Sequence, residues 1–322
     1  MRYVSLFIIF CYTILDMTKI EQAGITWIDI KKPTKESIAA LEPIIKLHPI
    51  VKHELLVPAF RAKTDVYEEE MCYLVLHFPV FDEETKIAQP QELDFVITKK
   101  VLLTAHYEKN PALEDVIKEL TENEQLRKRL MRINTVRLVH EIILRNFHLA
   151  GRQLDHIEKQ ISLIEKHIFF SRGNNTVREI SLLRSDIINF ARAMRPLEPV
   201  FDELRAYAKT IFGKQWNIYF TNMVSDYRKT INIIETRSQA IESLRVTNDS
   251  LTSFHTNRFL KILAIINLLA LPIIIIESLI GARWYLQEIR GSFALLELLY
   301  AVILGIAIDL ALLAFFRYKK WL

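Results

Sequence analysis

Residues 259–280 read FLKILAIINLLALPIIIIESLI, and residues 293–316 read FALLELLYAVILGIAIDLALLAFF. A helix needs about 20 mostly apolar residues to cross a hydrocarbon core of roughly 30 Å, and each segment is long enough. The linker between them, residues 281–292, is too short to hold a folded domain. The two segments therefore predict a pair of transmembrane helices joined as a hairpin, with residues 256–322 as the membrane domain.

Basic residues flank the two apolar segments unequally. Five flank the inner ends of the two segments, and two stand in the linker: Arg258, Lys261, Arg317, Lys319 and Lys320 against Arg283 and Arg290. Cytoplasmic flanks of membrane helices carry the excess of Lys and Arg. This asymmetry predicts a multi-pass protein of the plasma or inner membrane, with both termini in the cytoplasm and the linker outside.

The rest of the chain is highly charged but nearly neutral. Residues 1–255 hold 35 basic and 34 acidic side chains, whereas a nucleic-acid-binding surface needs net positive charge, so nucleic acid is not an expected partner. The sequence contains no Gly-rich phosphate loop, HExxH motif or GxSxG motif, and an enzyme is not expected. The two cysteines, Cys11 and Cys72, match no metal-ligand spacing and provide no disulfide framework.

Residues 1–125 have the pattern of an α/β domain. Alternating or continuous apolar runs predict strands at 24–30, 73–81, 92–98 and 101–107. A helix is predicted from Pro33 and Thr34 through Leu47, with Thr34 as its N-cap. Strands mixed with helices indicate a mixed sheet covered by helices, so the fold class is α+β.

Residues 126–255 have the pattern of a helical stalk. Apolar residues recur three and four positions apart, which predicts helices over 112–170 and 175–212. The 58 residues 214–271 contain neither Gly nor Pro. As one helix this stretch would be roughly 87 Å long, at about 1.5 Å per residue. It begins polar and ends inside the first apolar segment, so we expect a long helix that continues from water into the membrane.

One face of the first apolar segment collects its polar and small residues. Steps of three and four positions from Asn257 reach Leu260, Ala264, Asn267, Leu271, Ile274 and Ser278. Polar rings at Asn257 and Asn267, with apolar rings between and beyond them, would line a narrow pore that can close by dewetting. Small and polar residues also pack helices together in membranes. Spacing alone does not decide between these two interpretations.

Two carboxylates lie inside the apolar segments near their predicted outer ends. Glu277 stands one turn inside the end of the first segment, and Glu297 stands about one turn inside the start of the second. Carboxylates in membrane segments are costly and often functional, so they could coordinate a cation, relay a proton or neutralise Arg283. For Glu297, an interfacial position in contact with water is the simpler interpretation. The deeper Asp309 is expected to have a structural role.

This layout resembles the CorA family of divalent-cation channels, and short motifs agree with the family in order and spacing along nearly the whole chain. Residues 25–30 (ITWIDI) are similar to the family's opening strand, and residues 77–81 (HFPVF) to a later strand. Residues 219–226 resemble the start of the family's stalk helix, and residues 317–322 (RYKKWL) its closing basic tail.

The resemblance implies a homo-oligomer, a pentamer, that is embedded in the lipid bilayer and passes a divalent cation down its electrochemical gradient. Mg²⁺ is the first candidate for the transported ion and for a regulatory ion, and no cofactor is implied. The resemblance also favours the pore interpretation of the face from Asn257 to Ser278. Two alternatives remain open: a zinc or proton-coupled transporter of the same fold, and a non-conducting membrane scaffold derived from the family.

The sequence departs from the family's pattern at two places. The Gly-Met-Asn signature at the outer end of the first span is replaced by Gly281, Ala282 and Arg283. A loop at the outer mouth would then carry a ring of Arg side chains, which stay charged and repel a dication. The family's acidic cation sensor at the start of the stalk is matched best by Asn222, with Asp226 one turn later. Asp82, Glu83 and Glu84 could face this position across a subunit boundary. The alternative is that these are solvated surface charges.

Overall fold

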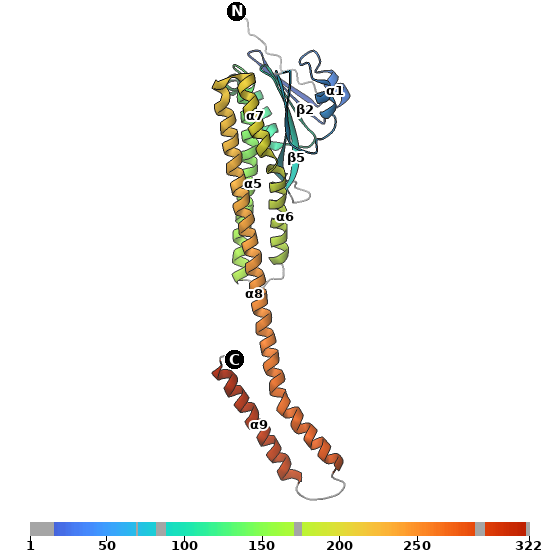
Figure 1. Cartoon of the computed structure of the whole chain (residues 1–322), viewed down its shortest axis with the longest axis vertical. Coiled ribbons are helices and arrows are strands. Elements are labelled where there is room, and N and C mark those ends of the chain that lie inside the picture. The colour runs from blue at the N-terminus through green and yellow to red at the C-terminus, as the bar shows by residue number, and fades with distance from the viewer. Residues whose placement is uncertain (1–15, 69, 82–87, 171–175, 287–293, 320–322) are drawn as a thin grey trace, which may run out of the picture. The chain divides into compact units, whose positions relative to one another are not determined.

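The computed structural model describes residues 16–68, 70–81, 88–170, 176–286 and 294–319. The chain divides into two compact units, Met1–Arg245 and Val246–Leu322 (Figure 1). The first unit contains the sheet and most of the helices. Helix α8 (Asn217–Leu286) belongs to both units, and the second unit also contains helix α9 (Ala294–Tyr318).

The first unit is built on a mixed six-stranded sheet. In chain order its strands are β1 (Met17–Gln22), β2 (Ile25–Lys31), β3 (Lys63–Tyr67), β4 (Met71–Phe81), β5 (Ala88–Ile97) and β6 (Val101–His106). Across the sheet the order is β1-β2-β6-β5-β4-β3; β2 and β6 are parallel, and all other neighbours are antiparallel. The four predicted strands are confirmed. The sequence pattern did not predict the two edge strands, β1 and β3.

The predicted helix from Thr34 to Leu47 is wrong in its extent. Helix α1 spans only Lys35–Ala39. Its predicted N-cap is confirmed, since the Ser37 N–H donates to Thr34 Oγ1 at 3.2 Å and the Thr34 N–H donates to Ser37 Oγ at 2.8 Å. Pro43 cannot donate the hydrogen bond that would continue the helix. The chain therefore passes into turns after Ala39.

The remaining helices of the first unit are α2 (Pro49–Glu54), α3 (Pro111–Glu122), α4 (Glu124–Leu130), α5 (Val136–Phe170), α6 (Thr176–Met194) and α7 (Leu197–Phe212), followed by the 3-10 turn η1 (Lys214–Trp216). The region predicted to be helical over 112–170 is thus three helices. Asn123 separates the first two, because its extended backbone ends α3 and its side chain accepts the Leu126 N–H at 3.0 Å to begin α4.

Helices cover both faces of the sheet, which explains why β4 is apolar almost throughout (Figure 1). On one face Trp27, Leu74 and Phe95 join the core formed with α3 and α5 to α7. On the other face Tyr73 and Val96 lie in a smaller core with α1 and α2. The first unit therefore has two apolar cores, one on each side of the sheet.

Helix α8 is continuous over 70 residues, which confirms the predicted long helix. Gly213, with φ +90°, ends α7 in a backbone conformation that side-chain-bearing residues rarely adopt, and the chain then turns through η1 into α8. Pro272 lies inside α8 without ending it. The helix also runs past the predicted end at Ile280 as far as Leu286.

The apolar part of α8 is largely uncovered in the single chain. Within the described residues, one helix, Lys214–Ser278, is long and apolar enough to cross a membrane. Only 11% of its most apolar stretch is buried. The predicted second span falls on α9 (Ala294–Tyr318). The arrangement as two membrane spans stays a prediction.

Candidate functional site

The seven predicted pore-lining residues all lie on α8, and all are exposed in the single chain; they are Asn257, Leu260, Ala264, Asn267, Leu271, Ile274 and Ser278. The three large apolar members are about half exposed, with Leu260 at 54%, Leu271 at 49% and Ile274 at 53%. We call this set the polar row of α8. Nothing within the chain's described residues covers it.

A second row on the same helix is turned toward α9. Ile265 and Pro272 are buried, and Leu269 and Ile276 are half-buried. Gly305 of α9 lies so close to Ile276 that an added Cβ there would meet the Ile276 Cδ1 atom. At about 100° per residue, the centre of this buried row lies roughly 140° around α8 from the centre of the polar row. The polar row therefore faces away from α9.

The predicted outer-mouth residues are helical. Gly281, Ala282 and Arg283 continue α8, so the prediction of a loop at this position is wrong. The continuous helix also separates Glu277 from Arg283, which were predicted to pair. Residues six apart are not neighbours on a helix, where only positions three and four apart face each other. A carboxylate that neutralises Arg283 would therefore have to come from another helix.

The predicted carboxylate on the second apolar segment stands at the start of a helix. Glu297 lies in the first turn of α9. Further along α9, the Oδ1 atom of Asp309 is buried and accepts no hydrogen bond from the described residues. Neither observation tests a role in binding a cation.

The predicted sensor is only partly described. Asp82, Glu83 and Glu84 lie outside the described residues. Asp226, on α8, is paired with Lys229, whose Nζ atom is 2.8 Å from its Oδ1 atom. No group of three or more His, Cys, Asp or Glu residues that could hold a metal ion occurs in the part of the chain that the structure describes. Asp226 therefore has no described acidic neighbours arranged for a metal ion.

A surface pocket lies beside Asp226. Its volume is about 550 Å³, and α5 and α8 contribute its lining. Asp155 of α5 is a second carboxylate in this pocket, but Arg152 and Lys229 also line it. Two carboxylates with two cations make a poor site for a dication.

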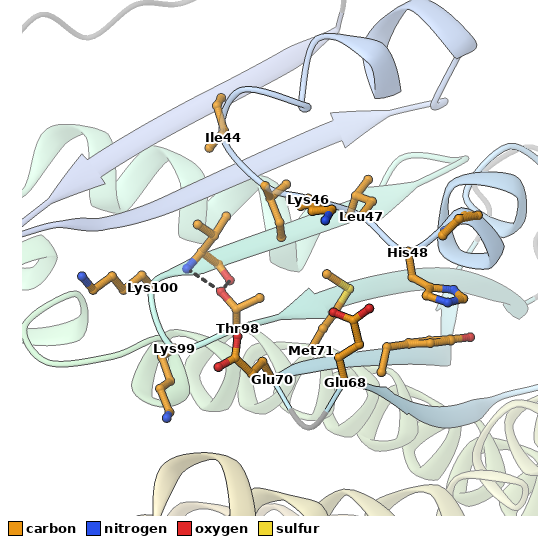
Figure 2. A pocket seen from close by; sticks show the side chains of 14 residues that line it. Ile44, Lys46, Leu47, His48, Glu68, Glu70, Met71, Thr98, Lys99 and Lys100 are labelled. Carbon is orange, nitrogen blue, oxygen red and sulfur yellow. Dashed lines mark hydrogen bonds between the residues drawn. The ribbon is translucent and has the colours of Figure 1, made fainter.

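A second pocket, of about 470 Å³, lies at one end of the sheet (Figure 2). It is formed by the segment before α2, the β3–β4 turn and the β5–β6 turn, where Thr98 Oγ1 accepts the Val101 N–H at 2.9 Å. Its charged lining residues are Lys46, Glu68, Glu70, Lys99 and Lys100. Figure 2 shows the ammonium groups of the three lysines well separated around it. With more ammonium groups than carboxylates, this pocket does not suit a divalent cation.

The sheet contains a buried polar network that the sequence pattern did not reveal as a site. The Trp27 Nε1–H donates to Thr104 Oγ1 at 3.0 Å, and the Thr104 hydroxyl donates to Asp29 Oδ1 at 2.5 Å. The His106 Nε2 atom is 3.3 Å from Asp29 Oδ2. Burial alone would lower the pKa of His106, but the Asp29 carboxylate and the Glu108 carbonyl together raise it. The only signal in the sequence was one acidic residue inside the apolar strand ITWIDI.

The comparisons with known proteins agree with this arrangement. The sequence profile of the CorA-like Mg²⁺ transporter protein family matches residues 22–282, and the match ends one residue before Arg283. A comparison with curated proteins found no match.

Solved structures share the fold at low sequence identity. The complete structure of the CorA magnesium transporter from Methanocaldococcus jannaschii superposes with a TM-score of 0.76 at 18% identity, over 94% of this chain and 93% of that chain. The full-length CmaX protein superposes with a TM-score of 0.70 at 13% identity, over 89% and 88%. The ZntB cytoplasmic domain from Vibrio parahaemolyticus RIMD 2210633 gives 0.59 at 12% identity, over 73% and 89%.

These structures show the fold of the sheet and of the long helix. The family match covers most of the chain, from the second strand to the end of the apolar part of α8. The chain therefore belongs to the CorA-like Mg²⁺ transporter protein family, a membrane-embedded family of divalent-cation transporters rather than enzymes.

Proposed function

We propose that the protein is a channel that passes a divalent cation, first of all Mg²⁺, down its electrochemical gradient. The single observation that carries this proposal is the polar row of α8, which is exposed in the chain and lies on the opposite side from the α9-facing row. Helices that surround a pore need such a face directed at the axis and another directed at the outer helices. Membership of a transporter family supports the same conclusion.

The pore would form between copies of the chain. A single α8 cannot enclose a path, so the proposal includes a homo-oligomer, a pentamer, with α8 and α9 of each copy as two spans of the bilayer. Its parts would be the sheet domain (1–125), the stalk (126–255) and the membrane hairpin (256–322). Asn257 and Asn267 would provide polar rings for a hydrated ion, and Leu260, Leu271 and Ile274 would provide the apolar constrictions. Both termini and the sheet would lie in the cytoplasm.

The membrane potential is sufficient to drive uptake. An inside-negative potential contributes about 2.3 kcal/mol per charge per 100 mV, and therefore about 4.6 kcal/mol for a dication. No nucleotide-binding motif is present in the sequence, which agrees with movement down a gradient. The polar members of the row are Asn and Ser side chains and not carboxylates, as suits a path that an ion must also leave.

A second candidate function rests on Arg283. A ring of guanidinium groups at the outer mouth opposes any dication, Zn²⁺ as well as Mg²⁺, and would be best tolerated by a non-conducting membrane scaffold. A zinc or proton-coupled transporter of the same fold is the other alternative. The choice depends on where the Arg283 side chains stand in the assembly. If they turn outward into water, the divalent-cation pathway stays open.

Flux measurements on purified protein in liposomes test the proposal. Mg²⁺, Zn²⁺, protons and chloride are measured in parallel, with a set inside-negative potential and with empty liposomes as the control. We expect Mg²⁺ entry that grows with the potential and exceeds the flux of the other three ions. A protein that moves only zinc or protons would replace the first proposal with the second, and absence of all flux would favour the scaffold.

Cysteine labelling tests the orientation. In a Cys11→Ser background, a Gln287→Cys variant is treated with a membrane-impermeant maleimide. Cys72 will not interfere, because it is buried and its pKa is raised to about 12. We expect labelling in intact cells, and labelling only in inverted vesicles would reverse the proposed topology.

A further inference from the structure

Strand β5 carries two carboxyl groups, Glu92 and Asp94, on the sheet face that is covered by α1 and α2. Asp94 has no exposed surface. Its Oδ2 atom accepts hydrogen bonds from the Tyr73 hydroxyl at 3.2 Å and from the Tyr107 hydroxyl at 3.3 Å. Its Oδ1 atom is equally buried but accepts no hydrogen bond from any described residue. A buried carboxylate oxygen without a donor is costly, so this atom needs a proton or a cation.

Glu92 lies two residues before Asp94 on β5, and therefore on the same face of the sheet. Its side chain is only 6% exposed, and its carboxyl group lies within hydrogen-bonding reach of Asp94. Glu92 Oε1 accepts the Ala59 N–H at 2.9 Å, and Oε2 lies 3.6 Å from His77 Nε2. Two carboxylates that share a buried site cannot both ionise cheaply.

The nearby Lys63 is engaged with other carboxylates and not with the pair. Lys63 stands over the ring of Tyr73, 5.2 Å from its centroid. That lysine is already held by Glu54 at 2.7 Å and by Asp65 at 2.8 Å. His77 is the other base that faces the pair. Burial, and then the neighbouring Glu92, raise the pKa of Asp94 well above its ordinary value, although hydrogen bonds from the two tyrosines oppose this.

We propose that Glu92 and Asp94 together bind one proton, which joins the orphan oxygen of Asp94 to Glu92, and that this proton fixes residues 55–61 on the sheet. Glu92 holds that segment through the Ala59 N–H. The Tyr107 hydroxyl shares its one hydrogen between Asp94 Oδ2 and the Leu55 carbonyl, which lies 3.2 Å away. When the proton leaves, the two carboxylates repel each other and Glu92 releases Ala59. The site thus links the proton concentration around the sheet unit to the attachment of this segment.

Residues 55–61 carry two exposed apolar side chains, whose position depends on whether the segment is attached to the sheet. Phe60 is 94% exposed, and Val57 is 58% exposed. The proton therefore controls the position of a surface that displays two apolar groups. The proposal concerns the sheet unit alone and does not depend on which ion the chain transports.

Infrared spectroscopy of the full chain in detergent micelles tests whether the proton is present. The carbonyl band of protonated carboxyl groups should be present at pH 7 in the wild type and should lose intensity in Asp94→Asn. The exposed carboxyl of Asp115 offers a matched control, and Asp115→Asn should keep the band. If the wild type has no such band at pH 7, the proton-binding site does not exist, and this result needs no variant to fold.

Hydrogen exchange tests the link to residues 55–61. At pH 9 we expect the amides of this segment to exchange at least tenfold faster in the wild type than in Asp94→Asn, because the asparagine amide keeps donating to Glu92 without a proton. At pH 6 the two proteins should exchange alike. Equal exchange at both values of pH would show that the proton does not fix the segment.

Discussion

The sheet of the first unit and the apolar part of α8 differ in whether the chain itself covers their side chains. In the sheet, buried polar groups such as those of Trp27, Thr104 and Asp29 form hydrogen bonds with one another within the chain. On α8, large apolar side chains remain exposed, with Phe259 at 65% and Ile273 at 59%. The sheet is a complete structure in a single chain, whereas the apolar part of α8 needs surroundings that the chain alone does not provide.

Two faces of α8 call for different surroundings outside the single chain. Apolar residues outside the polar row, such as Ile262, Ile266 and Ile273, suit lipid. The polar row, with Asn257 and Asn267, suits a water-filled path or the corresponding row of other copies. Exposure in the single chain thus indicates lipid on one side and an assembly on the other.

The largest expected effect comes from breaking α8 where it leaves the first unit. Ile241 is 2% exposed and belongs to the core of the sheet unit. Proline there removes a backbone hydrogen bond and clashes with the preceding turn, at a cost of about 3 kcal/mol or more. We expect Ile241→Pro to lose its oligomers on a sizing column and to unfold at a lower temperature.

Ile241→Val is the matched control for that experiment. It keeps the helix and removes one methylene group, at a cost of about 0.5–1.5 kcal/mol, and should still assemble. If the proline variant assembles and unfolds as the wild type does, the model of α8 as one continuous helix is wrong.

A smaller effect is expected at the outer end of α8. A guanidinium group about 6 Å from the ion, at an effective dielectric constant near 20, opposes it by about 3 kcal/mol per unit charge on the ion. If Arg283 lines the path, Arg283→Asn should raise divalent flux at least tenfold. Glu277→Gln should lower the flux, since it removes an intramembrane carboxylate that another copy of α8 could offer to Arg283, and Arg290→Asn is the control. Equal and substantial flux in wild type and Arg283→Asn would place Arg283 outside the path.

A pair of matched substitutions tests the two faces of α8 directly. Leu271 belongs to the polar row, and Ile273 lies outside it at similar exposure. An apolar constriction closes a pore by dewetting, so Leu271→Asn should raise basal flux several-fold in the liposome assay. Ile273→Asn should leave flux unchanged, because its side chain faces lipid in the proposed assembly. The opposite result would mean that the path lies along another face.

The sequence predicted those parts of the structure that depend on local pattern. The apolar runs of β4 and β6 and the 58 residues without Gly or Pro in α8 each identified one element. The apolar spacing after Thr34 predicts a longer helix than α1, because spacing does not record that Pro43 cannot continue a helix. The loop at 281–283 was expected from the family's signature, but Ala282 and Arg283 favour helix and the structure continues α8 through them.

The buried pair on β5 could not have been found from the sequence. Glu92 and Asp94 alternate with Leu93 and Phe95, which is the pattern of a strand with one face in water. That face is covered by α1, α2 and the segment after α2, which come from a distant part of the chain. The burial of a charged face by remote elements is a tertiary effect that alternation does not record.

The smallest expected effect concerns the Asp29–His106 pair, which tests how complete the sheet unit is by itself. Its environment raises the pKa of His106 above the unfolded value, so the folded state binds the proton more tightly. The resulting stability is fully present below about pH 6.5 and is lost as the pH rises through the folded pKa. It amounts to about 1.4 kcal/mol for each unit by which the pKa is raised.

Unfolding temperatures of wild type and His106→Gln, measured from pH 5.5 to 8.5, should therefore converge as the pH rises. His53→Gln, at an exposed position of α2, should run parallel to the wild type. A constant difference for His106→Gln would mean that the histidine is neutral in the folded sheet and that Asp29 is held by Thr104 alone.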